Sequence, residues 1–299
     1  MDRLTSMATF IRAVDLGSFA AAAEALDISA PMVGKHVRFL EERLGVRLLN
    51  RTTRRQSLTD FGRAYYDRCR TILAEASAAE ALAADHLGEP SGRLRVTMPA
   101  HFGRRCVAPV LYALAQRHPR LELELSFGDP LADLVQQGHD LAIRTGTLED
   151  RAGIVAKRIA RQPMLLCAAP AYLKRHGAPA ALDELAQHQA ILYGRSGWVR
   201  PWQFPRAGLP PLEIAPRGRL RLDDLAAMAD AAAAGLGIAW LPAWLIRDRL
   251  AKGELVAVLP EQPSFLYDVY ALWPQSPLLP LKVRVAVDEL AQALPTLMS

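Results

Sequence analysis

The sequence predicts an α/β fold in three parts: a small N-terminal helical domain with a β-hairpin, one long helix, and a larger domain in which strands and helices alternate. Three observations carry this prediction. Apolar residues recur at helical spacing up to residue 45, with Gly or Ser at the segment ends. A long helical pattern begins at Asp60, and strand and helix patterns alternate from about residue 93. We place the domain boundaries at 1–59, 60–89 and 90–299.

The composition is that of a globular chain with a basic N-terminal part. Of the 299 residues, 51% are hydrophobic and 22% are charged, and the net charge is +5. Residues 1–70 hold 12 Lys or Arg against 8 Asp or Glu, whereas residues 71–92 hold four acids and no base. This balance suits a polyanionic partner.

Cysteine usage and apolar segments bear on the location of the protein. Cys69, Cys106 and Cys167 are widely spaced and form no CxxC or Cys/His cluster, so we expect a reducing cytoplasm, no metal site and no cofactor. The first fifteen residues carry charges and lack a signal-peptide core. The Ala-rich segment 226–246 is interrupted by Asp, Gly and Pro, which favours a buried helix followed by a strand over a membrane span.

The N-terminal pattern predicts three helices. The first covers residues 4–16 and ends at Gly17; its apolar stripe is Leu4, Met7, Ile11 and Val14, with Phe10 beside it. Ser18 offers an N-cap to a short Ala-rich helix, and Ser29 caps a third helix that runs to about Leu44. The buried stripe predicted for this third helix is Val33, Val37, Leu40 and Leu44.

A basic hairpin is predicted after the third helix. Two short β-type runs, Val46–Leu49 and Gln56–Thr59, flank a polar tip with three arginines. Taken alone, Arg54 and Arg55 are equally well an ordinary solvated pair. Together, the helices and hairpin indicate a winged helix-turn-helix, whose third helix lies in the DNA major groove while the hairpin contacts phosphate.

The long helix has a heptad-like seam of mostly small residues. The seam consists of Tyr65, Cys69, Ile72, Ala76, Ala79 and Ala83. Small residues let two helices approach closely, so we predict a dimerisation helix. A lone helix lying on its own domain is the alternative.

The larger domain follows a Gly- and Pro-containing hinge at residues 88–92. We predict lobe 1 over about 93–167 plus 268–299 and lobe 2 over about 168–267. Strands are predicted at 94–98, 121–127, 140–144, 164–168, 190–193, 238–241, 255–258 and 267–272, and helices at 102–118, 131–138, 223–234 and 281–294. Ligands of such sheets bind where the strands end, near helix N-termini.

The segment LGSFAAAAEALDISAPMVGKHVRFLEERLGVRLLNRTTRRQSLTDFG resembles the N-terminal domain of LysR-type transcriptional regulators, and GRLRVTMP, DLAIRTG and AAGLGIAWLP resemble parts of their effector half. The resemblance implies an N-terminal winged helix-turn-helix, a long linker helix and a two-lobed α/β effector domain resembling periplasmic binding proteins. It implies a bacterial regulator, not an enzyme, that binds double-stranded promoter DNA as a dimer or tetramer. A small-molecule co-inducer, frequently a carboxylate, is expected between the lobes.

The resemblance also places particular residues at or near DNA. They are Ser18, Ala30, Pro31, Gly34, Lys35, Arg38, Arg51, Thr52, Thr53 and Arg54. The family often has Gln at the position of Ala30 and Ser at that of Gly34. We therefore expect fewer direct base hydrogen bonds here and more readout of DNA shape.

The expected effector residues lie mostly at predicted strand ends. They are Pro99, Ala100, His101, Phe102, Arg144, Thr145, Ala168, Asp223 and Gly235. His101 either donates to an anionic ligand or is a helix-start residue without a role, and Arg144 meets either a ligand carboxylate or an internal acid. Asp223 is expected to cap a helix of lobe 2. The core or its rim is expected to hold Trp198, Trp202, Trp240 and Trp244.

Two other classes of protein fit less well. The sequence contains no nucleophile elbow, Walker loop, GxGxxG fingerprint or HExxH motif, which disfavours a hydrolase. A transport-type solute-binding protein shares the two-lobed half, but it needs an export signal and has no use for a winged helix.

Overall fold

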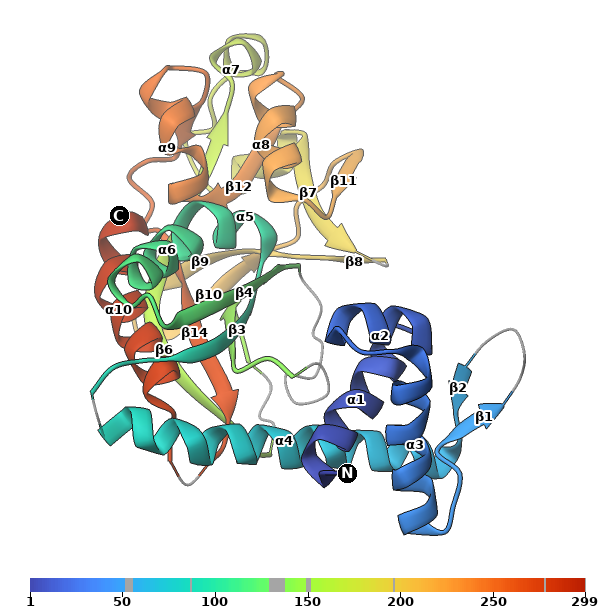
Figure 1. The fold of residues 1–299 in the computed structure, drawn as a ribbon. Helices are drawn as coiled ribbons and strands as arrows, with labels where there is room; N and C mark the ends of the chain where they lie inside the picture. The colour runs from blue at the N-terminus through green and yellow to red at the C-terminus, as the bar shows by residue number, and fades with distance from the viewer. Residues whose placement is uncertain are drawn as a thin grey trace. The chain divides into compact units, whose positions relative to one another are not determined.

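The computed structural model describes residues 1–51, 56–86, 88–128, 138–148, 152–195, 197–276 and 278–298 (Figure 1). Its contacts divide the chain into two compact units, one built mainly from Met1–Ser91 and the other mainly from Gly92 onward. Among the helices of these described residues, none is long and apolar enough to cross a membrane.

The first unit contains the predicted helices and hairpin. Its elements are α1 (Arg3–Asp15), α2 (Phe19–Leu26), α3 (Ala30–Leu44), β1 (Leu49–Arg51), β2 (Gln56–Leu58) and α4 (Asp60–His86). Both predicted serine caps are confirmed: Ser18 Oγ accepts from the Ala21 N–H and Ser29 Oγ from the Met32 N–H. Gly45 ends α3 with a φ of +72°, a left-handed conformation that glycine adopts without strain.

The apolar stripe predicted for the first helix is partly wrong. Leu4 is 40% exposed, whereas Phe10 and Ala13 are fully buried. The reason is that α1 packs against both α3 and α4, so its buried face is centred on Phe10. Asp2, which the prediction did not single out, caps α1 by accepting a hydrogen bond from the Thr5 N–H at 2.7 Å.

The start of the predicted seam in α4 is used inside its own unit. Cys69 is fully buried in the core that contains Phe10 and Leu40, and Tyr65 packs against the same core. Ile72 is 42% exposed, and the side chain of Ala83 lies outside the described residues. Cys69 is therefore inaccessible to a second helix, and Tyr65 is half-buried against the same core.

The second unit is a mixed sheet covered by helices. The strand order is β11-β7-β12-β6-β14-β5-β3-β4, with β13 paired to β6 and β8 to β7. The strands are β3 (Gly92–Met98), β4 (Leu121–Phe127), β5 (Leu141–Thr145), β6 (Ile154–Ala168), β7 (Ala190–Arg195), β8 (Trp198–Val199), β9 (Trp202–Arg206), β10 (Leu209–Ile214), β11 (Leu220–Leu222), β12 (Ile238–Pro242), β13 (Val256–Val258) and β14 (Phe265–Pro274). The helices are α5 (Ala100–Phe102), a π-helical turn (Gly103–Val107), α6 (Ala108–Arg117), α7 (Pro170–His176), a 3-10 turn (Asp183–Gln187), α8 (Leu225–Ala233), α9 (Ala243–Ala251) and α10 (Leu281–Met298).

Buried residues of this unit form separate cores, from which we define two lobes. Lobe 1 is the part around β3, β5, α6 and α10, and lobe 2 is the part around β7, β12, α8 and α9. Strands β6 and β14 run antiparallel, and β6 goes on to pair with β12 and β13 in lobe 2 (Figure 1). The prediction started β6 at Met164 instead of Ile154, because Lys157, Arg158 and Arg161 interrupt its apolar pattern.

One predicted helix is divided in the structure, and another lies mostly outside the described residues. The segment predicted as one helix over 102–118 consists of α5, the π-helical turn and α6, with Pro109 in the first turn of α6. Residues 131–137 of the helix predicted at 131–138 lie outside the described residues.

Candidate DNA-binding surface and effector site

The N-terminal half of α3 presents an exposed face that carries the predicted recognition residues. Pro31, Lys35 and Arg38 are exposed, and Ala30 and Gly34 are half-buried. Val33, Val37 and Leu40 on the opposite face are buried in the cores of the unit. The helix is thus anchored on one side and accessible on the other, as insertion into a major groove requires.

One residue of this face was missed by the sequence analysis. Met32 is 40% exposed at the start of α3, although a methionine at an apolar position is ordinarily expected in the core. Its only sequence signal is that it stands one position before the buried stripe. An exposed thioether at this point offers an apolar contact of the kind that thymine methyl groups accept.

Hydrogen bonds hold the hairpin against α3. Glu41 Oε1 accepts from the Leu48 N–H at 2.9 Å and from the Leu49 N–H at 3.3 Å. β1 pairs with β2 antiparallel, with Arg51 opposite Gln56. The predicted wing residues Thr52, Thr53 and Arg54 lie outside the described residues, as does the side chain of Arg51. Ser18 is engaged as the cap of α2.

In the second unit, strand ends from both lobes converge on one edge. β3 and β5 are parallel neighbours in lobe 1, so Pro99–Phe102, which follow β3, and Arg144–Thr145, which end β5, lie on the same side of the sheet. β7, β11 and β12 are also parallel, and Pro242 at the end of β12 is paired with Met164 of the crossing strand β6. The carboxyl ends of the parallel strands in each lobe therefore face the other lobe, where ligands of such sheets bind.

His101 and Asp224 join the two lobes at this edge. His101 Nε2 lies 2.7 Å from Asp224 Oδ2, and the two side chains are 30% and 48% exposed. Asp224 Oδ1 accepts from the Ala227 N–H at 2.8 Å and so caps α8. This capping bond and the contact with His101 lower the pKa of the Asp224 carboxyl below its usual value.

The structure corrects the predicted cap of α8. Asp224 is the N-cap, not Asp223, which is exposed and precedes it. The sequence pattern alone does not distinguish which of the two adjacent aspartates caps the helix. The backbone decides the matter, because only Asp224 stands one residue before the first helical turn.

Three further predicted effector residues lie elsewhere. Phe102 is 3% exposed and packs against the Trp244 ring in the lobe 1 core. Ala168 is at the far end of β6, and Gly235 precedes β12, so both lie at the opposite end of the lobe 2 strands from Asp224. Ala168 was predicted as the last residue of the strand placed at 164–168, and it does end β6.

Arg144 and Thr145 lie at the end of β5, and most of the tryptophans are buried. Arg144 is half-buried, and one of its terminal nitrogens donates to the Ile143 carbonyl at 2.8 Å. Thr145 pairs with Val269 of β14. Three of the four tryptophans are in the core, at 3–4% exposure, whereas Trp198 is 54% exposed.

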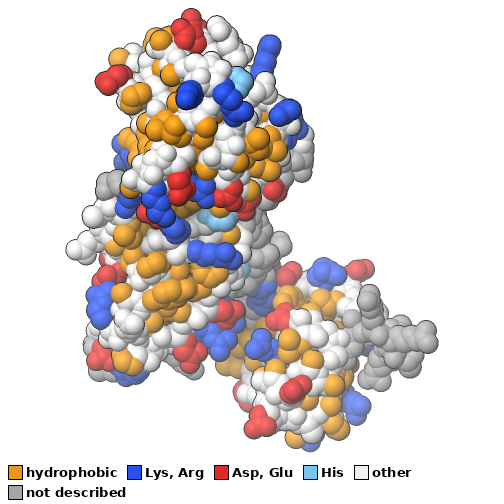
Figure 2. Space-filling view, turned by 90° about the horizontal axis from the view of Figure 1, so that it is seen from above, with side chains coloured by type: hydrophobic (Ala, Val, Ile, Leu, Met, Phe, Trp, Pro, Cys, Tyr) orange, Lys and Arg blue, Asp and Glu red, His pale blue; other side chains and the backbone are white. Residues whose placement is uncertain are grey.

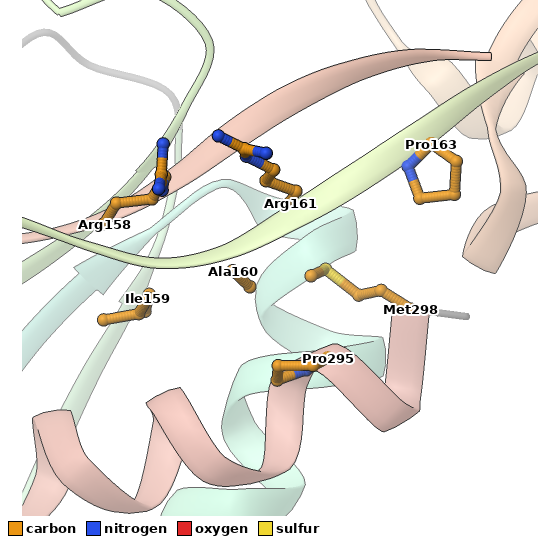
Figure 3. Close-up of a pocket in the computed structure, with 7 residues that line it drawn as sticks. All are labelled: Arg158, Ile159, Ala160, Arg161, Pro163, Pro295 and Met298. Atoms are coloured by element: carbon orange, nitrogen blue, oxygen red, sulfur yellow. The ribbon is translucent and has the colours of Figure 1, made fainter. Parts of the chain in front are cut away.

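A pocket of about 470 Å³ lies elsewhere in lobe 1, between β6 and the end of α10 (Figure 3). Arg158 and Arg161 project to one side of β6, and Ile159, Met298 and Pro295 lie on the other (Figure 3). Both arginines form ion pairs with Asp268. Asp268 thus offsets one of these two positive charges, and we do not assign the effector to this pocket.

The fold and these two surfaces define a class of protein: a DNA-binding regulator with a winged helix-turn-helix and a two-lobed ligand-binding domain. Residues 4–63 match the family model of the bacterial regulatory helix-turn-helix proteins of the lysR family, and residues 87–295 match that of the LysR substrate binding domain. The chain belongs to the LysR family of transcription regulators, whose members are not enzymes. The family, the fold class and the regulatory function predicted from the sequence are confirmed.

Named relatives are similar along nearly the whole chain. A transcriptional repressor of Pseudomonas aeruginosa is 35% identical over 289 residues, which covers 96% of this chain and 91% of the relative. The transcriptional activator AaeR of Escherichia coli is 33% identical over 293 residues, with coverage of 97% and 93%. The structure of CrgA, a LysR-type regulator from Neisseria meningitidis, matches with a TM-score of 0.60 at 32% identity, over 97% of this chain and 98% of that one.

Proposed function

We propose that this regulator contacts promoter DNA through the exposed face of α3 and through its wing. The main observation behind this proposal is that Pro31, Lys35 and Arg38 lie on the exposed side of a helix whose other side is buried. Ala30 and Gly34 complete the face, and Arg51, Thr52, Thr53 and Arg54 are the proposed wing contacts. On the face of the second unit visible in Figure 2, acidic and basic side chains are interspersed, so a polyanion gains little attraction from that face.

We further propose that a small anionic co-inducer, a carboxylate, binds between the lobes beside Pro99, Ala100, His101, Arg144 and Thr145. The His101–Asp224 contact supports this assignment, because these two side chains follow strands of different lobes and lie within hydrogen-bond distance of each other. A ligand that binds between the lobes and breaks this contact favours a different lobe arrangement. Differential affinity of this kind is what couples a ligand to a conformational equilibrium.

The working unit in this proposal is a homodimer or a tetramer in the cytoplasm. A two-fold operator needs two recognition helices, and two-fold symmetry supplies them. The exposed Ile72 and Ala79 of α4 are available for this association, whereas Cys69 is not. The divisions 1–59, 60–89 and 90–299 remain our proposed domain boundaries.

The test combines footprinting with a ligand screen. The full-length protein should protect two half-sites in DNA upstream of its own or a neighbouring gene. A thermal-shift screen of small carboxylates should give at least one compound that raises the melting temperature, because a ligand that binds only the folded state stabilises it. That compound should then alter the footprint; an unchanged footprint with every bound ligand would contradict the coupling.

A further inference from the structure

Arg200 is surrounded by aromatic rings directly after β8, beside Tyr193 of β7. Its guanidinium carbon lies 4.6 Å from the centre of the Tyr193 ring, 5.4 Å from that of Tyr267 and 5.8 Å from that of Trp198. The Arg200 N–H also donates to the Tyr193 carbonyl at 2.9 Å. Cation–π contacts with three rings and a fixed backbone therefore hold this guanidinium in place before any ligand arrives.

Among the described residues, the guanidinium of Arg200 has no hydrogen-bond or ion-pair partner. Other arginines of the same unit differ, since Arg161 pairs with Asp268 and Arg117 with Glu289. A planar guanidinium that is oriented but unpaired is suited to a carboxylate, which it binds through two parallel hydrogen bonds.

The surroundings of Arg200 belong to the edge where the lobes meet. Tyr267, which contacts Arg200, lies on β14 opposite Gln162 of β6, where these strands pass between the lobes. The same ring faces the end of β5, because a Cβ placed on Gly146 would lie 3.8 Å from it. Arg200 thus approaches the strand ends of lobe 1 from the lobe 2 side.

Trp198 adds an apolar surface to this charge. It is 54% exposed, in contrast to the 3% of Trp202 and the 4% of Trp240. An indole exposed to solvent beside a half-buried cation contributes little to folding, whereas the ring can stack against a flat ligand. The combination of an anion-binding group with an adjacent aromatic face selects for a ligand that has both features.

We propose that the co-inducer is an aromatic carboxylate, with its carboxylate bound by the Arg200 guanidinium and its ring against Trp198. This inference rests on the proposed effector function and names the ligand class of that site. Neither a simple inorganic anion nor an aliphatic acid uses both features.

Isothermal titration calorimetry of the full-length protein with benzoate and 2-naphthoate tests the proposal. Benzamide keeps the ring without the charge, and cyclohexanecarboxylate keeps the charge without the aromatic ring. We expect benzamide to bind at least about tenfold more weakly than benzoate, since a charge-assisted pair is lost. Cyclohexanecarboxylate should bind at least about threefold more weakly than benzoate, since stacking is lost.

Variants assign the binding to the residues. Arg200→Gln should weaken benzoate binding about ten- to hundredfold, and Arg200→Lys should weaken it less because the charge remains. Trp198→Leu should reduce both the affinity and the quenching of tryptophan fluorescence by the ligand. Arg206→Gln is the matched control: Arg206 is exposed in β9, its Nε donates to the Pro210 carbonyl, and its loss should leave binding unchanged.

Specific results would overturn the proposal. One is that neither aromatic acid binds at millimolar concentration. Another is that benzoate binds Arg200→Gln as tightly as the wild type while the melting temperature of the variant is unchanged. A third is that cyclohexanecarboxylate binds the wild type as tightly as benzoate does. If in any of these cases a non-aromatic ligand still stabilises the protein and changes its footprint, the proposed effector function survives and only the ligand class is wrong. If no small molecule does so, the effector function fails as well.

Discussion

His101 at the start of α5 and Asp224 at the start of α8 form a contact of 2.7 Å that links the two lobes of the second unit. Asp224 uses its other carboxylate oxygen to cap α8. One side chain therefore stabilises a helix locally and joins the lobes, so a change at this position acts on both.

Two substitutions of Asp224 separate these roles. Asp224→Ser keeps a capping oxygen and loses the carboxylate, whereas Asp224→Ala loses both. Because an alanine N-cap costs about 0.5–2 kcal/mol relative to serine, Asp224→Ala should unfold at a lower temperature than Asp224→Ser. Circular dichroism melts provide the measurement, with Asp223→Ala as the neighbouring control. Identical melting of the two Asp224 variants would contradict the capping role.

Gly34→Ser tests the expectation that this recognition face makes few base hydrogen bonds. A Cβ at position 34 would lie 3.6 Å from the Phe19 ring, which is ordinary contact distance, so the fold should tolerate the change. Serine also has the better helix propensity, by a few tenths of a kcal/mol. We expect unchanged or slightly higher stability together with an altered operator preference, measured by selection from a randomised DNA pool. An unaltered preference would count against base contact at this position.

Lys35→Ala and Arg38→Ala should each weaken binding to all DNA sequences. Loss of one phosphate contact should flatten the dependence of log affinity on log salt concentration by about one unit. Arg43→Ala is the control, because Arg43 is an exposed base in the last turn of the same helix, away from its N-terminal half. Fluorescence anisotropy across a salt series gives the slopes. A slope change for Arg43→Ala as large as that for the other two would refute this assignment of the DNA-facing side.

His36 should make the stability of the first unit depend on pH. Its Nδ1 lies 3.0 Å from Oγ of the fully buried Ser6. Burial, with the N-terminal amine and Lys35, lowers the pKa of His36 below its usual 6.5. The unfolded chain then binds more protons than the folded chain, so stability should fall as the pH drops from 6.5 through the folded pKa.

Urea unfolding of the wild type and of His36→Gln at pH 7 and pH 5 checks this expectation. The loss of stability on acidification should be smaller in the variant. Burial also lowers the pKa of His188 in the second unit, so the variant keeps part of the dependence. Equal losses in both proteins would rule out the role of His36.

The thiols should be unreactive in the folded protein. All three cysteines are buried, and burial raises the pKa of Cys69 and Cys106 to about 11 and that of Cys167 to about 12. Few thiolates are then present at neutral pH to react. Ellman's reagent should label the protein only after denaturation. Rapid labelling of a native thiol would show that burial does not protect it.

The sequence alone determined the features that depend on neighbours in the chain. Ser18, Ser29 and Gly45 were placed at helix ends because capping is a contact between residues a few positions apart. The family resemblance likewise came from a contiguous segment, since the third helix and wing are consecutive. Strands with a clear apolar pattern, such as β4 and β12, were found for the same reason.

The tertiary structure decided what depends on distant segments. It showed that Cys69 lies in its own domain core, that β6 begins at Ile154, and that Ala168 and Gly235 lie away from the lobe junction. It also brought His101 to Asp224, which is 123 positions away, and Tyr267 to Arg200. The spacing of apolar residues along the sequence does not predict such pairs, because only the pairing of the strands determines which loops meet at one edge of the sheet.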